Sequence, residues 1–190
     1  MSVVTGPVAA EAGPRVAPTP YALVAATGTP MVSRTKHELL ALSRGAETRP
    51  LTGGSRDLVL VTVQQARFWT PLTRQVYAQV ASRGATVVVF GVGMRSDPTA
   101  ARSRQVVTVP ISADDPLAEE WNVLFLSGRS RHGFVARQQD GPVPAGKPGA
   151  DMQRTFAWAD VRDDAVLDEA AQTLLDRVPD LRLTLPGAAR

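Results

Sequence analysis

The sequence predicts an α/β fold: a single domain with a mixed sheet of five to six strands and helices packed on it. Two apolar, β-branched runs at residues 57–64 and 85–92 flank a segment with helical spacing, which is the order of a parallel β–α–β unit. Two further apolar runs at 122–126 and 133–137 are joined by a short polar tip, as in an antiparallel hairpin. Together they put one parallel unit and several antiparallel strands in the same sheet.

The first expected element is a helix that begins after Thr35. Thr35 and Glu38 have the spacing of a capping box, and Leu39, Leu42 and Ala46 then fall on one helical face. This helix precedes the strand at 57–64, so it is expected to pack its apolar face on the sheet.

The helix of the parallel unit has clear signals at both ends. Thr70 can cap it, Pro71 suits its first turn, and Gly84 stands where a helix normally ends. Its buried stripe is predicted to consist of Leu72, Val76 and Val80. The strand at 85–92 follows directly, so the helix should cover one face of the parallel pair.

The second half of the chain contributes shorter elements. A strand is expected at 105–111, and a helical turn then begins at an acidic cap. The residues that build this turn and lead into the hairpin are Asp114, Asp115, Pro116, Leu117 and Glu120. A strand at 155–158 precedes a last helix, capped by Asp163 or Asp164, whose inward face would hold Leu167, Ala171, Leu174, Leu175 and Val178.

Composition marks the boundaries of the domain. Residues 1–32 show neither structural period and are expected to form a flexible tail, with 21–26 as the part able to dock on the body. The ordered domain is predicted at 33–178. Within it, the Gly/Pro-rich stretch 139–152 should be a mobile loop, and 179–190 a C-terminal tail that frays.

Composition also excludes several kinds of chemistry. The chain has no cysteine, so it has no disulfide, thiolate nucleophile or chromophore attached through cysteine, and any cofactor stays unknown. Its two histidines, His37 and His132, lie in separate segments, and no metal site is expected. A net charge of +3 is too small to indicate nucleic acid. The N-terminus lacks a secretory pattern and prolines interrupt the uncharged residues 16–33, so we expect a cytoplasmic protein without a membrane span.

Two loops are the first candidates for a binding site. The loop after the first parallel strand places two amides, Gln64 and Gln65, together with Arg67, Phe68 and Trp69, and loops at this position often line ligand sites. An equally good interpretation is that the two aromatic rings only attach the helix to the sheet. The loop after the second parallel strand carries Arg95, which could hold an anion or simply be solvated.

Several stretches together resemble the DICT domain, a bacterial sensory module associated with diguanylate cyclases and two-component systems. The most specific is residues 115–121, which match the family's Asp-Pro-Leu-x-x-Glu-Trp stretch. Residues 34–47 look like its opening helix, the Arg67-Phe68-Trp69 loop with Thr73 and Tyr77 is similar to its aromatic loop and helix, and 154–158 look like its closing segment. The resemblance implies a signal-input domain, linked in general to light or environmental responses, with no established catalytic activity.

These observations define one set of candidate ligand contacts: Gln65, Arg67, Phe68, Trp69, Thr73, Tyr77, Arg95 and Trp121. The first hypothesis is a non-enzymatic sensor or adaptor that binds a small ligand near this loop and regulates a signalling protein in trans, with a homodimer as a further option. A light response would need a pigment bound without a covalent bond.

Two alternatives remain open at this point. One is an enzyme that acts on an anionic metabolite, with Asp115 or Glu120 as base and Arg95, Arg102 or Arg104 as the substrate clamp. The other is a regulator associated with nucleic acid through the hairpin tip at Arg129 and Arg131. The enzyme requires these groups to share one cleft, whereas the nucleic-acid regulator predicts binding that depends steeply on salt.

Overall fold

The computed structural model describes residues 17–96, apart from 48–56, together with 106–128, 130–139 and 150–187. The strands are β1 (Val32–Thr35), β2 (Leu58–Gln65), β3 (Thr86–Val92), β4 (Val106–Ile111), β5 (Glu120–Leu126), β6 (Arg131–Gln138) and β7 (Thr155–Val161). The α-helices are α1 (Pro20–Ala26), α2 (Lys36–Glu47), α3 (Pro71–Ser82) and α4 (Asp164–Leu175). Short 3₁₀ turns are η1 (Ala66–Phe68), η3 (Pro116–Glu119), η4 (Ala150–Gln153) and η5 (Pro179–Leu181).

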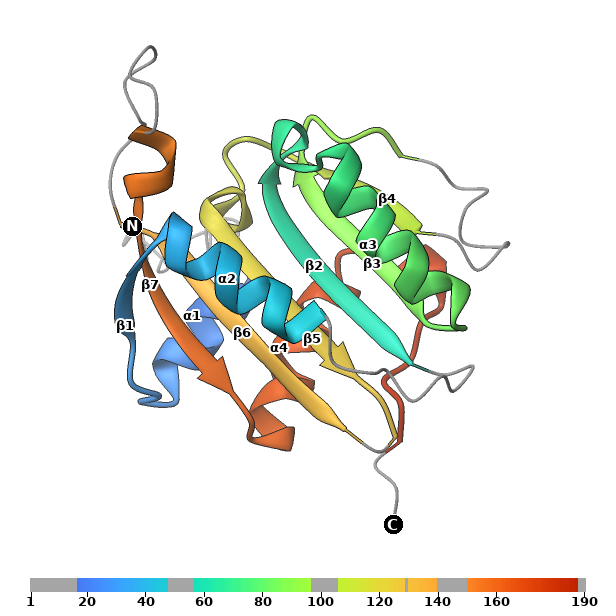
Figure 1. Ribbon diagram of the computed structural model, residues 1–190. Coiled ribbons are helices and arrows are strands. Elements are labelled where there is room, and N and C mark those ends of the chain that lie inside the picture. Colours follow the sequence, from blue (N-terminus) through green and yellow to red (C-terminus); the bar gives the residue numbers. More distant parts are fainter. Residues whose placement is uncertain (1–16, 48–56, 97–105, 129, 140–149, 188–190) are drawn as a thin grey trace, which may run out of the picture.

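All the strands join one sheet, in the order β1-β7-β6-β5-β2-β3-β4 (Figure 1). The predicted mixed α/β architecture is confirmed, since β2 and β3 are parallel and β5 and β6 form an antiparallel hairpin. The predicted number of five to six strands is wrong, because the sheet has seven. The additional strand, β1, is a four-residue edge strand with no buried residue, so its sequence has no apolar alternation to reveal it. β4 also extends the parallel part of the sheet by pairing with β3.

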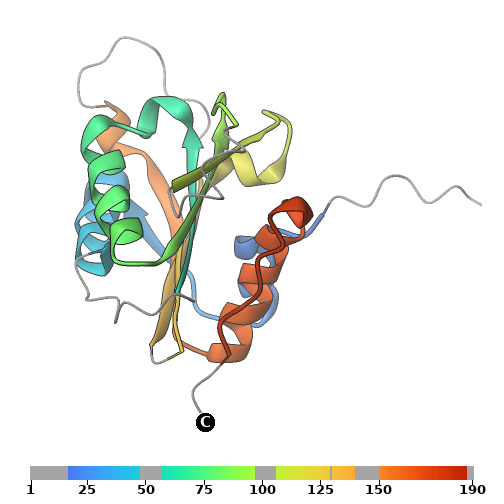
Figure 2. The same cartoon turned by 90° about the vertical axis from the view of Figure 1, so that its right-hand side faces the viewer.

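Helices cover both faces of the sheet. α2 and α3 lie on one face, whereas α1, α4 and the C-terminal segment lie on the other (Figure 2). Alternate residues of β2 supply the two cores: Val59 and Val61 pack on the side of α2 and α3, and Leu58 and Leu60 pack on the side of α1 and α4. This double coverage explains why β2 reads as an unbroken apolar run.

The helix starts follow the predicted chemistry. The capping box after β1 is confirmed, because Thr35 N donates to Glu38 Oε2 at 2.7 Å and Glu38 N donates to Thr35 Oγ1 at 3.3 Å. Thr70 caps α3 by accepting from Thr73 N. Asp163, rather than Asp164, caps α4.

Two predicted core leucines are exposed. Leu42 in α2 is 40% exposed and Leu72 in α3 is 61% exposed. Leu39 and Val80 of the predicted stripes are buried, but Ser43 accompanies Leu39 and Tyr77 accompanies Val80, so both buried faces are rotated from the predicted stripes. Ser43 and Tyr77 were not part of the apolar pattern, which is why the pattern misplaced the buried faces.

Both termini of the described chain differ from the predicted tails. Within residues 17–32, assigned to a flexible tail, α1 forms and buries Val24 completely against the core shared with α4. At the other end, Leu183 and Leu185 pack on the same core, and the carbonyl of Pro186 accepts a hydrogen bond from Arg131. The docking of α1 agrees with the expectation for 21–26, whereas local composition did not indicate the long-range contacts of the C-terminal segment. The predicted loop at 139–152 falls largely outside the described residues, apart from Gln139 and the turn η4.

Glu120 attaches α1 to the sheet. Its side chain is fully buried, and Oε2 accepts from Tyr21 N at 3.2 Å and from Asn122 Nδ2 at 2.8 Å. Burial raises the pKa of Glu120, and the hydrogen bonds from Thr19, Asn122 and Tyr21 only partly oppose this effect. The buried acid therefore holds its proton to higher pH than an exposed glutamate does.

The native protein should lose stability as the pH rises because Glu120 ionises, and we expect Glu120→Gln to abolish this loss. Glu120 has its ordinary pKa of 4.5 when unfolded and a higher pKa when folded, so its protonated form stabilises the fold fully below pH 4.5. That contribution is lost as the pH rises toward the folded pKa, whereas glutamine never ionises. Urea unfolding of both proteins across this pH window measures the difference. Parallel stability curves for the two proteins would show that Glu120 does not titrate in this way.

Candidate functional site

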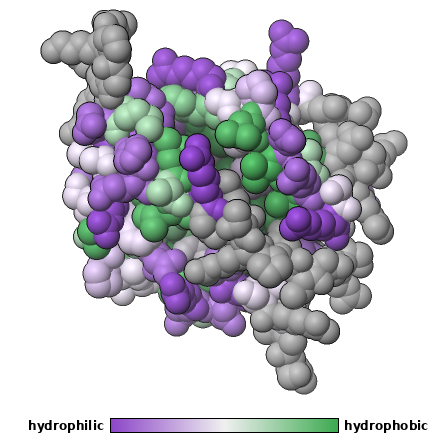
Figure 3. All heavy atoms as spheres, viewed as in Figure 1, coloured by the Kyte–Doolittle hydropathy of each residue, from purple (hydrophilic) through white to green (hydrophobic). Residues whose placement is uncertain are grey.

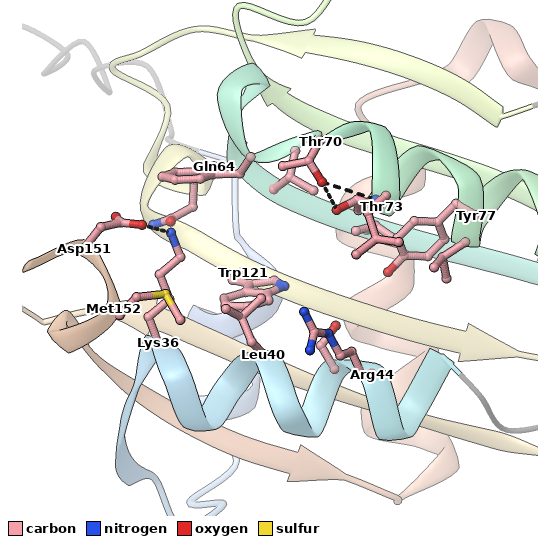
Figure 4. Close-up of a pocket in the computed structure, with 16 residues that line it drawn as sticks. Lys36, Leu40, Arg44, Gln64, Thr70, Thr73, Tyr77, Trp121, Asp151 and Met152 are labelled. Atoms are coloured by element: carbon pink, nitrogen blue, oxygen red, sulfur yellow. Dashed lines mark hydrogen bonds and ion pairs between the residues drawn. The ribbon is translucent and has the colours of Figure 1, made fainter. Parts of the chain in front are cut away.

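A cavity of about 570 Å³ opens between α2 and α3 on one face of the sheet (Figure 3). Strand β2 forms part of its floor through Val61 and Val63. Leu40 lines it from α2 and Val76 lines it from α3. Trp121 of β5 lies beside Leu40 on the floor (Figure 4). The lining combines apolar side chains with several polar ones, of which Lys36, Gln64 and Asp151 lie together at one end (Figure 4).

Aromatic packing holds the floor in place. Trp121 is half-buried and contacts two buried rings edge-on, with ring centroids 6.2 Å from Phe134 and 6.2 Å from Phe156. Tyr77 lines the cavity from α3 and stacks on Trp69 at 5.6 Å between centroids. These contacts fix the position of the rings that a ligand would meet.

One end of the cavity is polar. Lys36, the first residue of α2, forms an ion pair with Asp151 of η4, and its Nζ lies 3.8 Å from the centroid of the Phe68 ring. Arg154 Nε lies 2.9 Å from Asp151 Oδ1, so one carboxylate serves two cations. The sheet thus brings α2, η1 and η4 together at this end (Figure 4).

A bulge in β2 directs a glutamine into the same region. Gln64 has a φ of 58°, and the pairing of β2 with β3 shifts register between Thr62 and Gln65. Because of the extra residue, the consecutive Val63 and Gln64 both line the cavity, which regular alternation forbids. Gln64 Nε2 donates to the Glu119 carbonyl at 3.1 Å, which fixes the amide. Backbone strain of this kind is concentrated at functional sites.

Crowding of positive charge shifts the pKa values at this end. Burial lowers the pKa of Lys36, and repulsion from Arg154 and Arg67 lowers it further, against the opposing effect of Asp151. Burial would raise the pKa of Asp151, but the hydrogen bond from Lys36 and the neighbouring cations outweigh it and leave that pKa lowered. Asp151 is therefore ionised at neutral pH.

The predicted ligand contacts divide into two groups. Phe68, Thr73, Tyr77 and Trp121 line the cavity. The other four, Gln65, Arg67, Trp69 and Arg95, do not line it. Arg67 lies over the Phe68 ring at 4.9 Å, Trp69 is buried behind Tyr77, and Gln65 and Arg95 are exposed.

Sequence reasoning missed the part of the site contributed by α2 and η4. Lys36, Leu40 and Arg44 come from α2, and Asp151 and Met152 come from η4. The capping box was the one available signal, since it placed Lys36 at the start of a helix. Nothing in the sequence indicated that this helix end would meet a segment more than a hundred residues away.

The acidic residues of the enzyme hypothesis lie in structural positions. Asp115 Oδ1 accepts from Leu117 N at 2.9 Å, which caps η3, and its other oxygen pairs with Arg177. Asp114 is exposed, Pro116 opens η3 and Leu117 is fully buried. Glu120 faces α1, whereas the next residue, Trp121, faces the cavity. Arg102 and Arg104 are outside the described residues.

The hairpin arginine of the nucleic-acid hypothesis is already engaged. The Arg131 side chain is only 6% exposed and pairs with Asp168 of α4 at 2.5 Å. It thereby joins β6, α4 and the C-terminal segment. Arg129 is outside the described residues.

Two other features are absent from the described ranges. The residues placed there contain no group of three histidine, aspartate or glutamate side chains that could hold a metal ion. No helix in this part of the chain has the length and apolar character needed to cross a membrane.

The fold and the cavity define an α/β domain with an accessible pocket on one face of its sheet. The family model of the sensory domain in diguanylate cyclases and two-component systems, DICT, matches residues 21–139, more than half of the chain. The chain therefore belongs to the DICT family, and the resemblance drawn from its motifs is confirmed. The match begins within α1 and ends one residue after β6. It therefore includes α2, α3 and the floor of the cavity but not η4.

Comparison with solved structures gave two weak likenesses. TrmBL2, an archaeal chromatin protein, aligns with a TM-score of 0.45 and 9% identity over 83% of this chain and 57% of its own. A polyphosphate kinase from Porphyromonas gingivalis aligns with a TM-score of 0.44 and 13% identity over 81% of this chain and 23% of its own. The chain thus spans little more than half of one and a quarter of the other, and neither likeness bears on function. No curated protein matches the chain.

Proposed function

We propose that this protein is a cytoplasmic sensor that binds a small molecule in the cavity between α2 and α3 and signals to another protein through contact rather than catalysis. The observation that carries the proposal is the cavity. Its volume of about 570 Å³ suits a small organic ligand, and its walls combine apolar side chains with a few polar ones. Membership of a sensory family supports the signalling role.

The position of the cavity offers a route for the signal. Each of two helices contributes one wall, with Leu40 on α2 and Val76 on α3. A ligand that binds more tightly to one spacing of these helices shifts the population toward that spacing. The outer surface of α2, where Leu42 is exposed, would then present the change to a partner.

A filled cavity should not bind a ligand, and Leu40→Trp tests this. We expect the variant to bind the fluorescent probe anilinonaphthalene sulfonate about tenfold or more weakly than the native protein, because the indole occupies the ligand volume. Fluorescence titration measures the affinity. Circular dichroism verifies that the fold is retained.

Leu42→Trp is the matched control on the same helix. Leu42 is exposed and does not line the cavity, so this variant should bind the probe like the native protein. Equal affinities for the native protein and Leu40→Trp, or equal losses in both variants, would contradict binding in the cavity.

A further inference from the structure

Resting on the proposed function, we infer that the ligand is an organic anion with an apolar body and that its charged group lies against Lys36 at the Phe68 end of the cavity. The inference concerns the chemical class of the ligand. It depends on the distribution of charge around the cavity and on the character of the remaining walls.

Three cations surround one aromatic ring at this end. Lys36 Nζ, Arg67 Cζ and Arg154 Cζ lie 3.8, 4.9 and 5.1 Å from the centroid of Phe68. We call Lys36, Arg67 and Arg154 the cation cluster. Asp151 is the acidic residue that pairs with it, through Lys36 and Arg154. One carboxylate against three cations leaves a net positive charge beside the cavity.

The cluster retains unused capacity to bind an anion. Arg154 is 6% exposed, yet its Nη2 is buried without a hydrogen-bond partner among the described residues. Its Nη1 donates to the neutral amide of Gln138 at 2.7 Å, which satisfies a donor without neutralising the charge. Arg67 has no ion pair within the described part of the chain. A further anion would therefore relieve repulsion that the described residues leave in place.

Two other features of the cavity walls also contribute positive charge or positive potential. Arg44 of α2 lines the cavity and lies between α2 and α3 (Figure 4). Thr70 and Thr73 also line it, and they form the N-terminus of α3, whose first turn contains no acidic residue. The positive end of this twelve-residue helix adds to the field of the cluster.

The rest of the cavity demands an apolar body. Val61, Val63 and Leu40 offer only hydrocarbon, and Trp121 and Tyr77 offer ring faces and edges. A small inorganic ion would leave these walls uncovered, whereas a neutral apolar molecule would leave the positive charge unmatched. An amphipathic organic anion satisfies both regions.

A pair of probes that differ by one charged group tests the inference. Anilinonaphthalene sulfonate carries a sulfonate, and phenylnaphthylamine is the same aromatic skeleton without it. We expect the native protein to bind the sulfonate about tenfold or more tightly, with a preference that decreases as salt is raised from about 0.05 M to about 0.5 M.

Charge-removing variants locate the anionic group. Lys36→Met should reduce affinity for the sulfonate relative to affinity for phenylnaphthylamine, so that the ratio of the two affinities falls toward one. Arg67→Gln, on an exposed side chain that supports no ion pair in the described residues, should reduce the sulfonate preference less and without risk to the fold. Arg95→Gln is the matched control, because Arg95 is exposed like Arg67 but belongs neither to the cavity lining nor to the cation cluster.

The outcomes separate this inference from the proposed function. Equal binding of the two probes overturns the inference. So does a sulfonate preference that is lost in Arg44→Met but retained in Lys36→Met. In either case, probe binding that Leu40→Trp blocks still supports the sensor. Equal effects of Arg67→Gln and Arg95→Gln also overturn it, because a general surface charge would then explain the preference. Probe binding that Leu40→Trp leaves intact overturns the proposed function itself.

Discussion

The substitution Phe156→Ala is expected to lower the free energy of unfolding by about 3–5 kcal/mol. The ring is fully buried, contacts Trp121 edge-on at 6.2 Å and lies 5.5 Å from the Arg154 guanidinium. Its removal leaves a cavity directly under the floor of the candidate site. Urea unfolding measures the loss of stability, and probe titration of the folded fraction should show weaker binding because Trp121 loses support.

Phe156→Leu is the control for this prediction. It retains most of the buried volume, so its cost should stay below about 1.5 kcal/mol and probe binding should change little. If the alanine variant were as stable as the leucine variant, Phe156 would not be the packed core residue described above.

The substitution Gly133→Ala should destabilise the fold by about 2–3 kcal/mol through overpacking. Gly133 of β6 pairs with Leu124 of β5, and a Cβ there would lie 2.8 Å from Leu124 Cδ2 and 2.8 Å from the carbonyl oxygen of Val123. The backbone oxygen cannot move without disturbing the ladder between β5 and β6. Urea unfolding gives the stability change, and hydrogen exchange should show faster exchange in these two strands.

Gly187→Ala provides the comparison for Gly133. A Cβ at Gly187 has no atom within 4 Å, so the change should stay within about 0.5 kcal/mol of the native stability. Equal effects at the two positions would show that loss of glycine flexibility, rather than the close approach of β5, determines the cost.

The elements that the sequence predicted are those whose signals are local. The apolar run of β2, the Thr70 cap of α3 and the hairpin of β5 and β6 each depend on neighbouring residues. β1 and the segment around Leu183 were missed because they are ordered by distant partners. β1 pairs with β7, and Leu183 packs on the core of α4. Short elements of this kind carry no periodicity of their own.

The candidate site depends even more than the fold on contacts that local sequence signals do not reveal. The loop after β2 was singled out with both of its glutamines. Gln65 was the expected ligand contact, whereas Gln64 lines the cavity. Strand alternation favours Gln65, and the bulge reverses that assignment. The ion pair of Lys36 and Asp151 joins residues 115 positions apart, which no spacing rule could reveal.

The most direct test of the sensor is to locate a bound probe by nuclear magnetic resonance. Intermolecular Overhauser contacts between anilinonaphthalene sulfonate and the methyl groups of Leu40, Val63 and Val76 are expected, since these side chains line the cavity. Contacts confined to methyl groups of the opposite face, such as those of Val24 and Leu167, would contradict the account.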